Sequence, residues 1–468
     1  MVLELLFLAV LRHPQIKPAQ VWEKTLAPGL IYRMEVDPNL PRTVNAIRLS
    51  LGSPSLRWVP ELAGKTINEE GSVKGRRTPT VMAADANAIV AVNGDFFSYE
   101  QGAPIGQFIR AGELITTPLK PRAVFGWGPK DAKTGFANAA AYATFGGANE
   151  IRLEALNQPL SQNGIALYTP AEGILSPPKG NVIAILKVPE GSFSPTTTAT
   201  AIVESISTDS GKTTVQPGHA YLVGVGEKGS PVASLREGDK VGLRFRTDGF
   251  DWEQYENEIG GGPFLVRDGE LAIDGSEEGF GADFLGRHPR TAIGKTADGD
   301  IWIVTVDGRQ GCSIGANLDE LAKLMLRLGC TDAINLDGGG STALNIFGLT
   351  VNRPSDGVER PVASGILIFG PRPTSIEGKL KLDVARKPEA DGTLQVVAKR
   401  NGKSVDNMDI LWTARGAAWI DQGGALHPLH AGKATVSGRI NGEAVTLEVR
   451  IPGQIPSDPK KVPVADRG

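Results

Sequence analysis

The chain has 468 residues, and its 49 Lys and Arg against 52 Asp and Glu give a formal net charge of −3 at pH 7. That balance, together with a sequence that has no basic run and no interleaving of basic and aromatic residues, argues against nucleic-acid binding. The length favours two or three domains. The 58 Gly, the 32 Pro and the short, interrupted apolar runs predict a strand-rich α+β fold with a mixed sheet, many loops and few helices.

Residues 1–27 form an apolar N-terminal segment that begins MVLELLFLAVLRHPQ. Its apolar run is interrupted by Glu4 and is too short to span a bilayer. A signal peptide carries its positive charge before the apolar run, whereas Arg12 follows the run here. We interpret the segment as a degraded or truncated export signal, with a packed apolar segment as the alternative. No later segment of the sequence is long and apolar enough to cross a membrane.

Alternation of apolar and polar residues predicts strands at 31–36 and 45–51, each with one wet face. A short helical piece at 81–87 precedes a buried strand at 88–92, which ends at the pentapeptide NGDFF of residues 93–97. Asn-Gly at a strand end is an ordinary hairpin signal. Two aromatic residues directly after it need a core or a ligand to cover them, so structural and functional interpretations both stay open.

Short strands separated by Pro, Gly and Ser/Thr clusters continue from residue 123 to residue 246, a pattern typical of a β-meander. A triple glycine at 260–262 then precedes a strand, and it allows either a tight corner or close approach of a ligand. Arg290 opens the next strand, directly after a proline. Its guanidinium is a candidate anion clamp, with a surface salt bridge as the alternative.

Residues 301–347 carry the densest pattern in the chain. Residues 301–306 predict a buried strand that runs into Asp307-Gly308. A helix follows, with Asn317 and Glu320 spaced as a capping box and Gly329 just after its last apolar turn. A second apolar strand at 333–336 leads to Asp337. If the two strands are parallel neighbours, Asp307 and Asp337 lie at the same edge of the sheet.

Asp337 is followed by the glycine-rich sequence GGGST of residues 338–342. Three successive glycines are tolerated where a group must approach closely or φ must be positive. Their N–H groups, with the two hydroxyls after them, could form a concave anion cradle beside the carboxylate. The alternative is a glycine-rich turn capped by Asp337.

The cysteines and histidines offer little chemistry. Cys312 and Cys330 flank the predicted helix, whose ends lie roughly 15 Å apart, so free thiols are expected. His427 and His430 form an HxxH pair without a third ligand nearby, which favours surface residues over a metal site.

The C-terminal part changes character after a closing strand at 360–369 and a Pro-rich linker at 371–373. Residues 375–452 show short alternating strands with Asn-Gly turns, which predicts a small β-sandwich of immunoglobulin-like type. Residues 453–468 are rich in Pro, Lys and Asp and predict a disordered tail.

The motifs NGDFF at 93–97, RTAIG at 290–294, Asp307-Gly308 and AINLDGGGS at 333–341 occur in the order and approximate spacing of the phosphodiester glycosidase family, which the chain resembles over roughly residues 75–370. The resemblance implies an α+β catalytic domain at residues 28–371. It also implies hydrolysis of the bond between a sugar anomeric carbon and a phosphodiester, in a secreted, lumenal or cell-envelope setting. The expected partner is therefore a glycan or sugar-phosphate.

From this resemblance we expect Asp337 and Asp307 to act at the sugar, while Arg290 and the loop of residues 338–341 hold the phosphate. Related proteins can carry Gly at position 95 and Gln at position 309, so we assign those two residues to binding. The complete set of expected binding residues is Asn93, Asp95, Phe97, Arg309, Asn335, Gly338, Gly339, Gly340, Ser341, Thr342 and Arg360.

Two other functions stay open. A phosphodiesterase would attack phosphorus instead of the anomeric carbon. A non-catalytic protein would bind envelope polysaccharide, with the C-terminal domain as a second binding module. We expect no cofactor, and a divalent cation between Asp307 and Asp337 is the less favoured alternative because few carboxylates cluster there. The sugar, the aglycone and the oligomeric state are not encoded in any motif.

Overall fold

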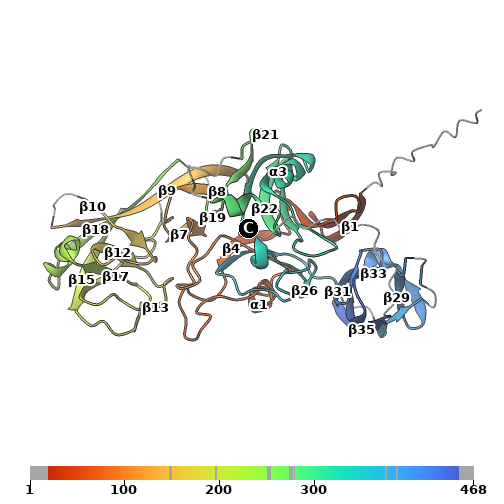
Figure 1. Ribbon diagram of the computed structural model, residues 1–468. Helices are drawn as coiled ribbons and strands as arrows, with labels where there is room; N and C mark the ends of the chain where they lie inside the picture. Colours follow the sequence, from red (N-terminus) through yellow and green to blue (C-terminus); the bar gives the residue numbers. More distant parts are fainter. Residues whose placement is uncertain are drawn as a thin grey trace, which may run out of the picture.

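The computed structural model describes residues 19–146, 150–194, 198–249, 255–273, 278, 280–374, 377–385, 388–389 and 391–452. The molecule has three parts in a row: a central body, a strand-rich lobe on one side, and the C-terminal strands on the other (Figure 1). This arrangement confirms the predicted strand-rich α+β class. None of the helices in the described part of the chain has the length and apolar character needed to cross a bilayer.

The central body contains an eight-stranded antiparallel sheet, in which three strands next to one another carry the site. The strands in spatial order are β1 (Gln20–Ala27), β2 (Leu30–Asp37), β3 (Arg42–Ser50), β23 (Asp300–Val306), β22 (Arg290–Thr296), β24 (Cys330–Asn335), β20 (Phe264–Arg267) and β21 (Glu270–Leu271).

A five-stranded sheet packs against one face of the eight-stranded sheet. Ile47, Ile293 and Ile334 from the larger sheet share a core with Val92 and Ile366 from the smaller one. The burial of these apolar side chains between two sheets is the main source of stability of the body. The smaller sheet runs β26 (Leu349–Thr350), β25 (Leu344–Ile346), β5 (Val90–Asn93), β27 (Ser364–Phe369) and β4 (Arg57–Leu62), and α1 (Pro79–Ala86) lies beside β5.

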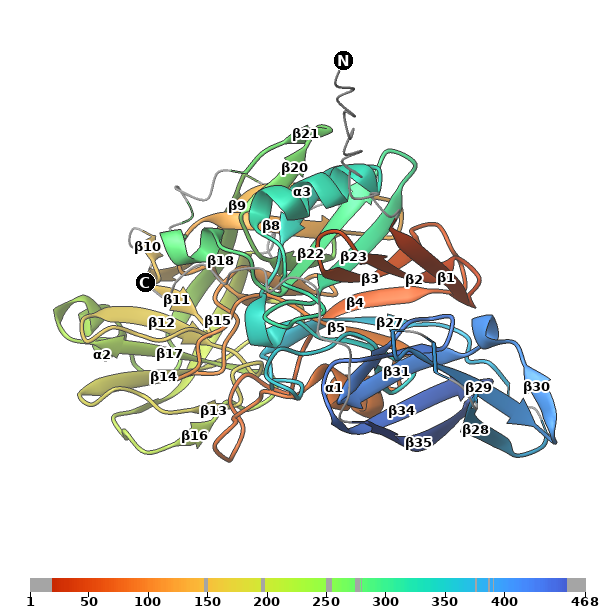
Figure 2. The same cartoon turned by 45° about the vertical axis from the view of Figure 1, so that its right-hand side comes forward.

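Helix α3 (Leu318–Arg327) covers the other face of the larger sheet, as the amphipathic pattern predicted (Figure 2). Its capping box is complete, because the Asn317 side chain accepts from the Glu320 amide and the Glu320 side chain accepts from the Asn317 amide. The two strands that flank α3 run in the same direction. They are not neighbours, because β22 lies between them and pairs with both.

A sheet of twelve strands builds the side lobe. Its long strand β9 (Ala132–Phe145) pairs with β8 (Arg122–Trp127) near the body and with β18 (Lys240–Asp248) further out. The remaining strands are β6 (Phe108–Arg110), β7 (Glu113–Thr116), β10 (Ile151–Arg152), β11 (Ala155–Leu156), β12 (Gly164–Tyr168), β14 (Asn181–Lys187), β15 (Thr198–Ser207), β17 (His219–Val225) and β19 (Asn257–Gly260), with the short helix α2 (Ser230–Ala233) and the separate pair β13 (Ile174–Leu175) and β16 (Thr213–Thr214).

The C-terminal strands form two sheets around one core that includes Leu380, Val396, Trp412 and Val436. The predicted Asn-Gly turns at 401–402 and 441–442 have positive φ at both residues, as two-residue hairpins require. The two-sheet arrangement agrees with a β-sandwich, while the immunoglobulin-like type remains a prediction. The strands are β28 (Leu380–Val384), β29 (Leu394–Arg400), β30 (Lys403–Val405), β32 (Ala418–Ile420) and β33 (Ala425–Pro428) in one sheet, and β31 (Leu411–Gly416), β34 (Gly432–Ile440) and β35 (Glu443–Ile451) in the other.

The N-terminal boundary of the body differs from the predicted one. Residues 20–27 were assigned to a separate N-terminal segment, but they form β1, the edge strand of the larger sheet. Their apolar residues are sparse because an edge strand buries little, which hid the alternation. The predicted export signal at 1–18 and the predicted tail at 453–468 lie outside the described residues. Cys312 and Cys330 are both free thiols, as expected.

Two arginines join the central body to the C-terminal sandwich. Arg353 donates to the carbonyls of Ala418 and Gly416 across the junction. Arg415, from the sandwich, donates to the carbonyls of Thr350 and Asn352.

Removal of the Arg415 side chain should loosen this junction, because two buried carbonyls lose a charged donor. We expect Arg415→Met to lower the free energy of unfolding by about 1–2 kcal/mol and to speed proteolytic cleavage of the linker near residues 371–373. The exposed Arg450 of the same sandwich supplies the control, Arg450→Met. Equal cleavage rates in the two variants would contradict the assignment.

Candidate active site

The site forms where β5 and β24 end side by side. The Asp337 amide donates to the Gly94 carbonyl over 3.1 Å, and the Asn93 side-chain amide donates to the Asp337 carbonyl over 2.6 Å. The Asn93 side-chain oxygen accepts from the Thr291 hydroxyl and the Ala343 amide. Two motifs more than 200 positions apart are therefore locked together by one buried asparagine.

Asp337 presents a partly exposed carboxylate at this junction. One oxygen accepts from the Gly338 amide over 2.8 Å, and the Ser341 hydroxyl also donates to the carboxylate. Burial among these walls raises its pKa to about 6, although both hydrogen bonds and the nearby Arg360 charge act in the opposite direction. Asp337 can therefore be ionised near neutral pH while remaining a good proton acceptor.

Asp95 is a second carboxylate of the site, close enough to Asp337 for the charge of Asp337 to affect its pKa. It is only 1% exposed, and its oxygens accept from the amides of Phe96 and Gly106, each over 2.7 Å. Burial, with a smaller contribution from the charge of Asp337, raises its pKa to about 7 against the lowering effect of Arg122. The sequence pattern paired Asp337 with Asp307, whereas in the structure the charge of Asp337 acts on Asp95.

The raised pKa of Asp95 makes a prediction about stability. A carboxyl that is harder to ionise in the folded state stabilises the fold at low pH, and this stabilisation is lost as the pH rises through its folded pKa of about 7. The free energy of unfolding should therefore fall between about pH 4 and pH 7, by at most about 1.4 kcal/mol per pH unit for this one group. We expect Asp95→Asn to flatten this slope in urea titrations, while Asp85→Asn, at an exposed position of α1, leaves it unchanged.

Asp307 faces away, toward the junction with the sandwich. Both of its oxygens accept from the Arg353 amide at 3.0 Å, and one accepts from the Asn352 side chain. Burial raises its pKa to about 6. Asn352 also donates to the Thr342 carbonyl, so Asp307 reaches the glycine loop through Asn352.

The glycine loop does not form the expected anion cradle, because most of its amides already have acceptors within the protein. Gly338 donates to Asp337, Gly339 to the Pro289 carbonyl, Ser341 to Gly338 and Thr342 to Gly339. The glycines instead give two guanidiniums room to approach the backbone. A Cβ atom at Gly339 would crowd Arg309 at 3.3 Å, and one at Gly340 would overlap Arg360.

Arg309 and Arg360 are therefore the cations beside Asp337. Arg309 takes a positive φ of 60° and lies with its Nη2 atom 3.2 Å from His288 Nδ1. Arg360 pairs with Asp356 and lies 3.5 Å from the Ser341 hydroxyl. The prediction that the loop binds an anion is thus better supported by these two side chains than by the loop amides.

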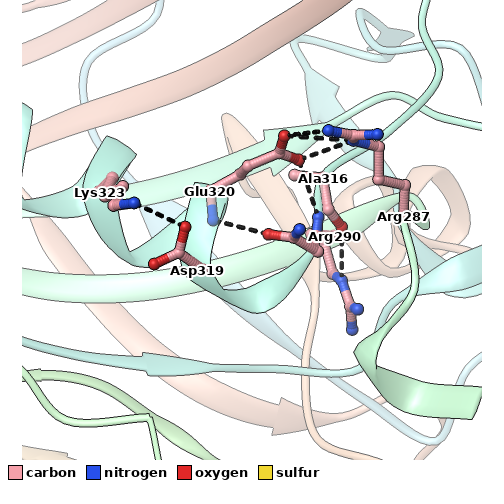
Figure 3. A network of polar contacts seen from close by, with 7 residues as sticks. Arg287, Arg290, Ala316, Asp319, Glu320 and Lys323 are labelled. Atoms are coloured by element: carbon pink, nitrogen blue, oxygen red, sulfur yellow. Dashed lines mark hydrogen bonds and ion pairs between the residues drawn. The ribbon is translucent and has the colours of Figure 1, made fainter. Parts of the chain in front are cut away.

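Arg290 takes a different position from the predicted clamp. It is 1% exposed, and its Nε and Nη2 atoms donate to the carbonyls of Ala316, Phe284 and Gly286. Figure 3 shows Arg290 reaching Ala316, next to the ion pair between Arg287 and Glu320 at the start of α3. These contacts give Arg290 a positioning role for two loops.

Several other predicted binding residues make contacts within the protein that support the site. The Asn335 side chain donates to the carbonyls of Gly262 and Leu336, which ties β24 to the second triple glycine. Thr342 is buried and accepts from the Thr291 hydroxyl. Phe97 packs against Tyr99, with ring centroids 4.9 Å apart.

Sequence reasoning missed two residues. Phe96, not Phe97, joins the aromatic rings of Phe280 and Phe284, at centroid distances of 5.5 and 5.9 Å. Arg122 lies beside Phe96 and Asp95, and nothing in its local sequence marks it. The pair of aromatics in NGDFF was a usable signal, but which of the two faces the site could not be read from it.

The described residues of the site do not form a metal-binding cluster. Among the residues that the structure describes, no group of three His, Cys, Asp or Glu side chains could hold a metal ion. The Nε2 atom of His427 lies 3.1 Å from a carboxylate oxygen of Asp421, and its ring stacks on Trp419 in the sandwich, away from this site.

Comparisons with known proteins point to one family. Residues 182–369 match the family model described as phosphodiester glycosidase. Over 186 residues the chain is 30% identical to the N-acetylglucosamine-1-phosphodiester alpha-N-acetylglucosaminidase of Bos taurus. This match covers 33% of this chain and 35% of the bovine protein. A 90-residue stretch is 43% identical to the SPbeta prophage-derived uncharacterized protein YomE of Bacillus subtilis (strain 168), covering 19% of this chain and 14% of YomE. The chain thus spans about a third or less of the length of these curated relatives.

Solved structures support the fold. A hypothetical protein from Synechocystis has a TM-score of 0.63 at 22% identity, covering 76% of this chain and 64% of that chain. A protein from Burkholderia pseudomallei K96243 has a TM-score of 0.58 at 20% identity, covering 74% of this chain and 76% of that chain.

Proposed function

We propose that this chain, whose residues 182–369 match the phosphodiester glycosidase family model, is a hydrolase that cleaves a sugar-1-phosphodiester between the anomeric carbon and the phosphate. The observation that carries the proposal is the partly exposed Asp337 carboxylate, coupled to buried Asp95 and flanked by Arg309 and Arg360.

Departure of a phosphate from the anomeric carbon builds positive charge on the sugar ring. In the proposed mechanism, ionised Asp337 stabilises that charge or attacks the anomeric carbon. Arg309 and Arg360 hold the phosphate oxygens and take up the negative charge that leaves with them. A phosphate is already a good leaving group, so little general-acid help is needed. Burial raises the pKa of Asp337, and the charge of Asp337 in turn raises the pKa of buried Asp95.

Asp307 and Arg290 keep the predicted catalytic role only as a hypothesis. Their contacts with Arg353, Asn352 and the loop carbonyls favour positioning of the site over contact with substrate. The proposal also includes an extracellular or cell-envelope setting and a GlcNAc-1-phosphate-type substrate in a glycan or exopolysaccharide. Both of these rest on the family resemblance.

Hydrolysis of a synthetic GlcNAc-1-phosphodiester in water enriched in oxygen-18 tests the reaction. Label in the released GlcNAc means cleavage at carbon and supports the proposal. Label in the phosphate means attack on phosphorus and supports the phosphodiesterase alternative. Binding of the substrate without turnover would favour the non-catalytic glycan-binding alternative, and a parallel reaction with chelator tests whether a metal takes part.

A further inference from the structure

Arg122, at the start of β8, has an unusual environment for a partly buried cation. Its Nε and Nη1 atoms are buried and have no hydrogen-bond acceptor among the residues that the structure describes. A guanidinium withdrawn from water without acceptors is costly for the folded state. Such a group is retained more readily when a ligand supplies the missing anion.

Two other arginines, Arg290 and Arg415, show how a guanidinium is satisfied elsewhere in this protein. Arg290 also stacks on a phenylalanine, at 4.7 Å from the ring of Phe284, yet it donates to three backbone carbonyls. Arg415 donates to three carbonyls as well. The unpaired donors of Arg122 therefore distinguish it from Arg290 and Arg415.

Two aromatic rings hold the Arg122 guanidinium in place. It lies 5.5 Å from the ring centroid of Phe96 and 5.0 Å from that of Phe280. Cation–π contacts of this kind use the faces of the guanidinium, whereas its N–H donors point outward in its plane. The rings thus fix the group without consuming its donors.

Asp95 does not satisfy Arg122, although it is close enough for the charge of Arg122 to lower its pKa. Both Asp95 oxygens already accept backbone amides, those of Phe96 and Gly106. No ion pair with Arg122 forms among the described residues. Arg122 is partly exposed as a residue although its Nε and Nη1 atoms are buried, so a ligand approaches the guanidinium from its exposed side.

We propose that Arg122 binds a second anionic group of the substrate, a phosphate or a carboxylate, at the Asp95 end of the site. This subsite is separate from Arg309 and Arg360, which lie over the glycine loop beside Asp337. The inference rests on the proposed function and narrows it: the substrate is an acidic saccharide whose charge is not limited to the scissile phosphodiester.

Three substrates test the proposal on wild type and Arg122→Gln. GlcNAc-1-phosphomethyl ester carries only the scissile phosphate, UDP-GlcNAc adds a second phosphate on the leaving side, and UDP-glucuronic acid adds a carboxylate on the sugar. We expect Arg122→Gln to raise KM for UDP-glucuronic acid, which carries both candidate anions, by about tenfold to a hundredfold and to change KM for the methyl ester little. A similar rise in KM for UDP-GlcNAc identifies the anion as the second phosphate, whereas an unchanged KM for UDP-GlcNAc identifies it as the carboxylate. Equal effects on all three substrates, or none, would overturn the proposal.

Binding measurements keep this test independent of turnover. Isothermal titration of inorganic phosphate and of glucuronate should show one of them weakened in Arg122→Gln and partly restored in Arg122→Lys, which keeps the charge. Arg236→Gln, at an exposed position in the side lobe, is the matched control and should bind as wild type does. If wild type hydrolyses none of the substrates, the proposed function fails, while loss of anion binding in Arg122→Gln still supports the subsite. Unchanged binding of both anions in a folded Arg122→Gln protein would refute it.

Discussion

Replacing Asp337 with Asn should lower kcat on a GlcNAc-1-phosphodiester by about a thousandfold and leave the protein folded. Asn keeps an oxygen that can accept from the Gly338 amide and the Ser341 hydroxyl, so the loop retains its contacts. What disappears is the negative charge, which either attacks the anomeric carbon or stabilises its developing positive charge. The loss should therefore lie in kcat far more than in KM, in steady-state kinetics.

Measurements of kcat for variants of other carboxylates serve as controls for Asp337→Asn. Asp319→Asn, on the exposed face of α3, controls for expression and handling and should match wild type. Asp307→Asn should lower kcat less than Asp337→Asn does, because Asp307 contacts Arg353 and Asn352 rather than the open site. Wild-type turnover by a folded Asp337→Asn protein would remove this carboxylate from the mechanism, and with it the proposed chemistry.

Local patterns predicted much of the fold correctly. The capping box at Asn317 and Glu320 and the apolar face of α3 are encoded within one segment, so the helix was predicted with its correct start. The strands of the side lobe were also located, because turn residues punctuate them. Sequence order even placed Asp307 and Asp337 after strands that run in the same direction.

Pairing across the sheet could not be predicted in this way. β22 pairs with β23 as a local hairpin, but its pairing with β24, which places it between the two strands, joins segments on either side of α3, and no local pattern predicts it. The same limit applies to Asp307, whose direction is set by Arg353 and Asn352, more than 40 positions along the chain. The acceptors of the loop amides could not be predicted either, because the Gly339 amide donates to the carbonyl of Pro289, on a different segment of the chain.

Arg122 shows the limit most clearly. The residues that define its environment are Asp95 and Phe96 on one segment and Phe280 on another, and only the folded chain brings them together. A single arginine after Lys-Pro has no distinguishing sequence pattern. Its significance comes from unpaired donors, which exist only as a property of the structure.

Replacing Arg290 with Met should destabilise the protein by about 3 kcal/mol, because buried carbonyls lose their donor. Arg290 is 1% exposed and supplies the bonds to Phe284 and Gly286, and it shares the Ala316 carbonyl with the His288 amide. Burial lowers the pKa of Arg290 to about 10, so the group stays charged at neutral pH and its bonds keep their charged character. Urea titrations at pH 7 would measure the loss.

Kinetics on the same variants separate a positioning role from the predicted phosphate clamp. Arg290→Lys keeps the charge but cannot make the forked contacts to the three carbonyls, so it should be destabilised nearly as much as Arg290→Met. A clamp on phosphate would behave in the opposite way: Lys would largely preserve KM for the phosphodiester, and both variants would unfold as wild type does. Arg287→Met removes the neighbouring exposed partner of Glu320 and should cost about 1 kcal/mol or less. A large fall in stability for both Arg290 variants, with Arg287→Met nearly silent, would assign Arg290 to holding the loops that frame Asp337.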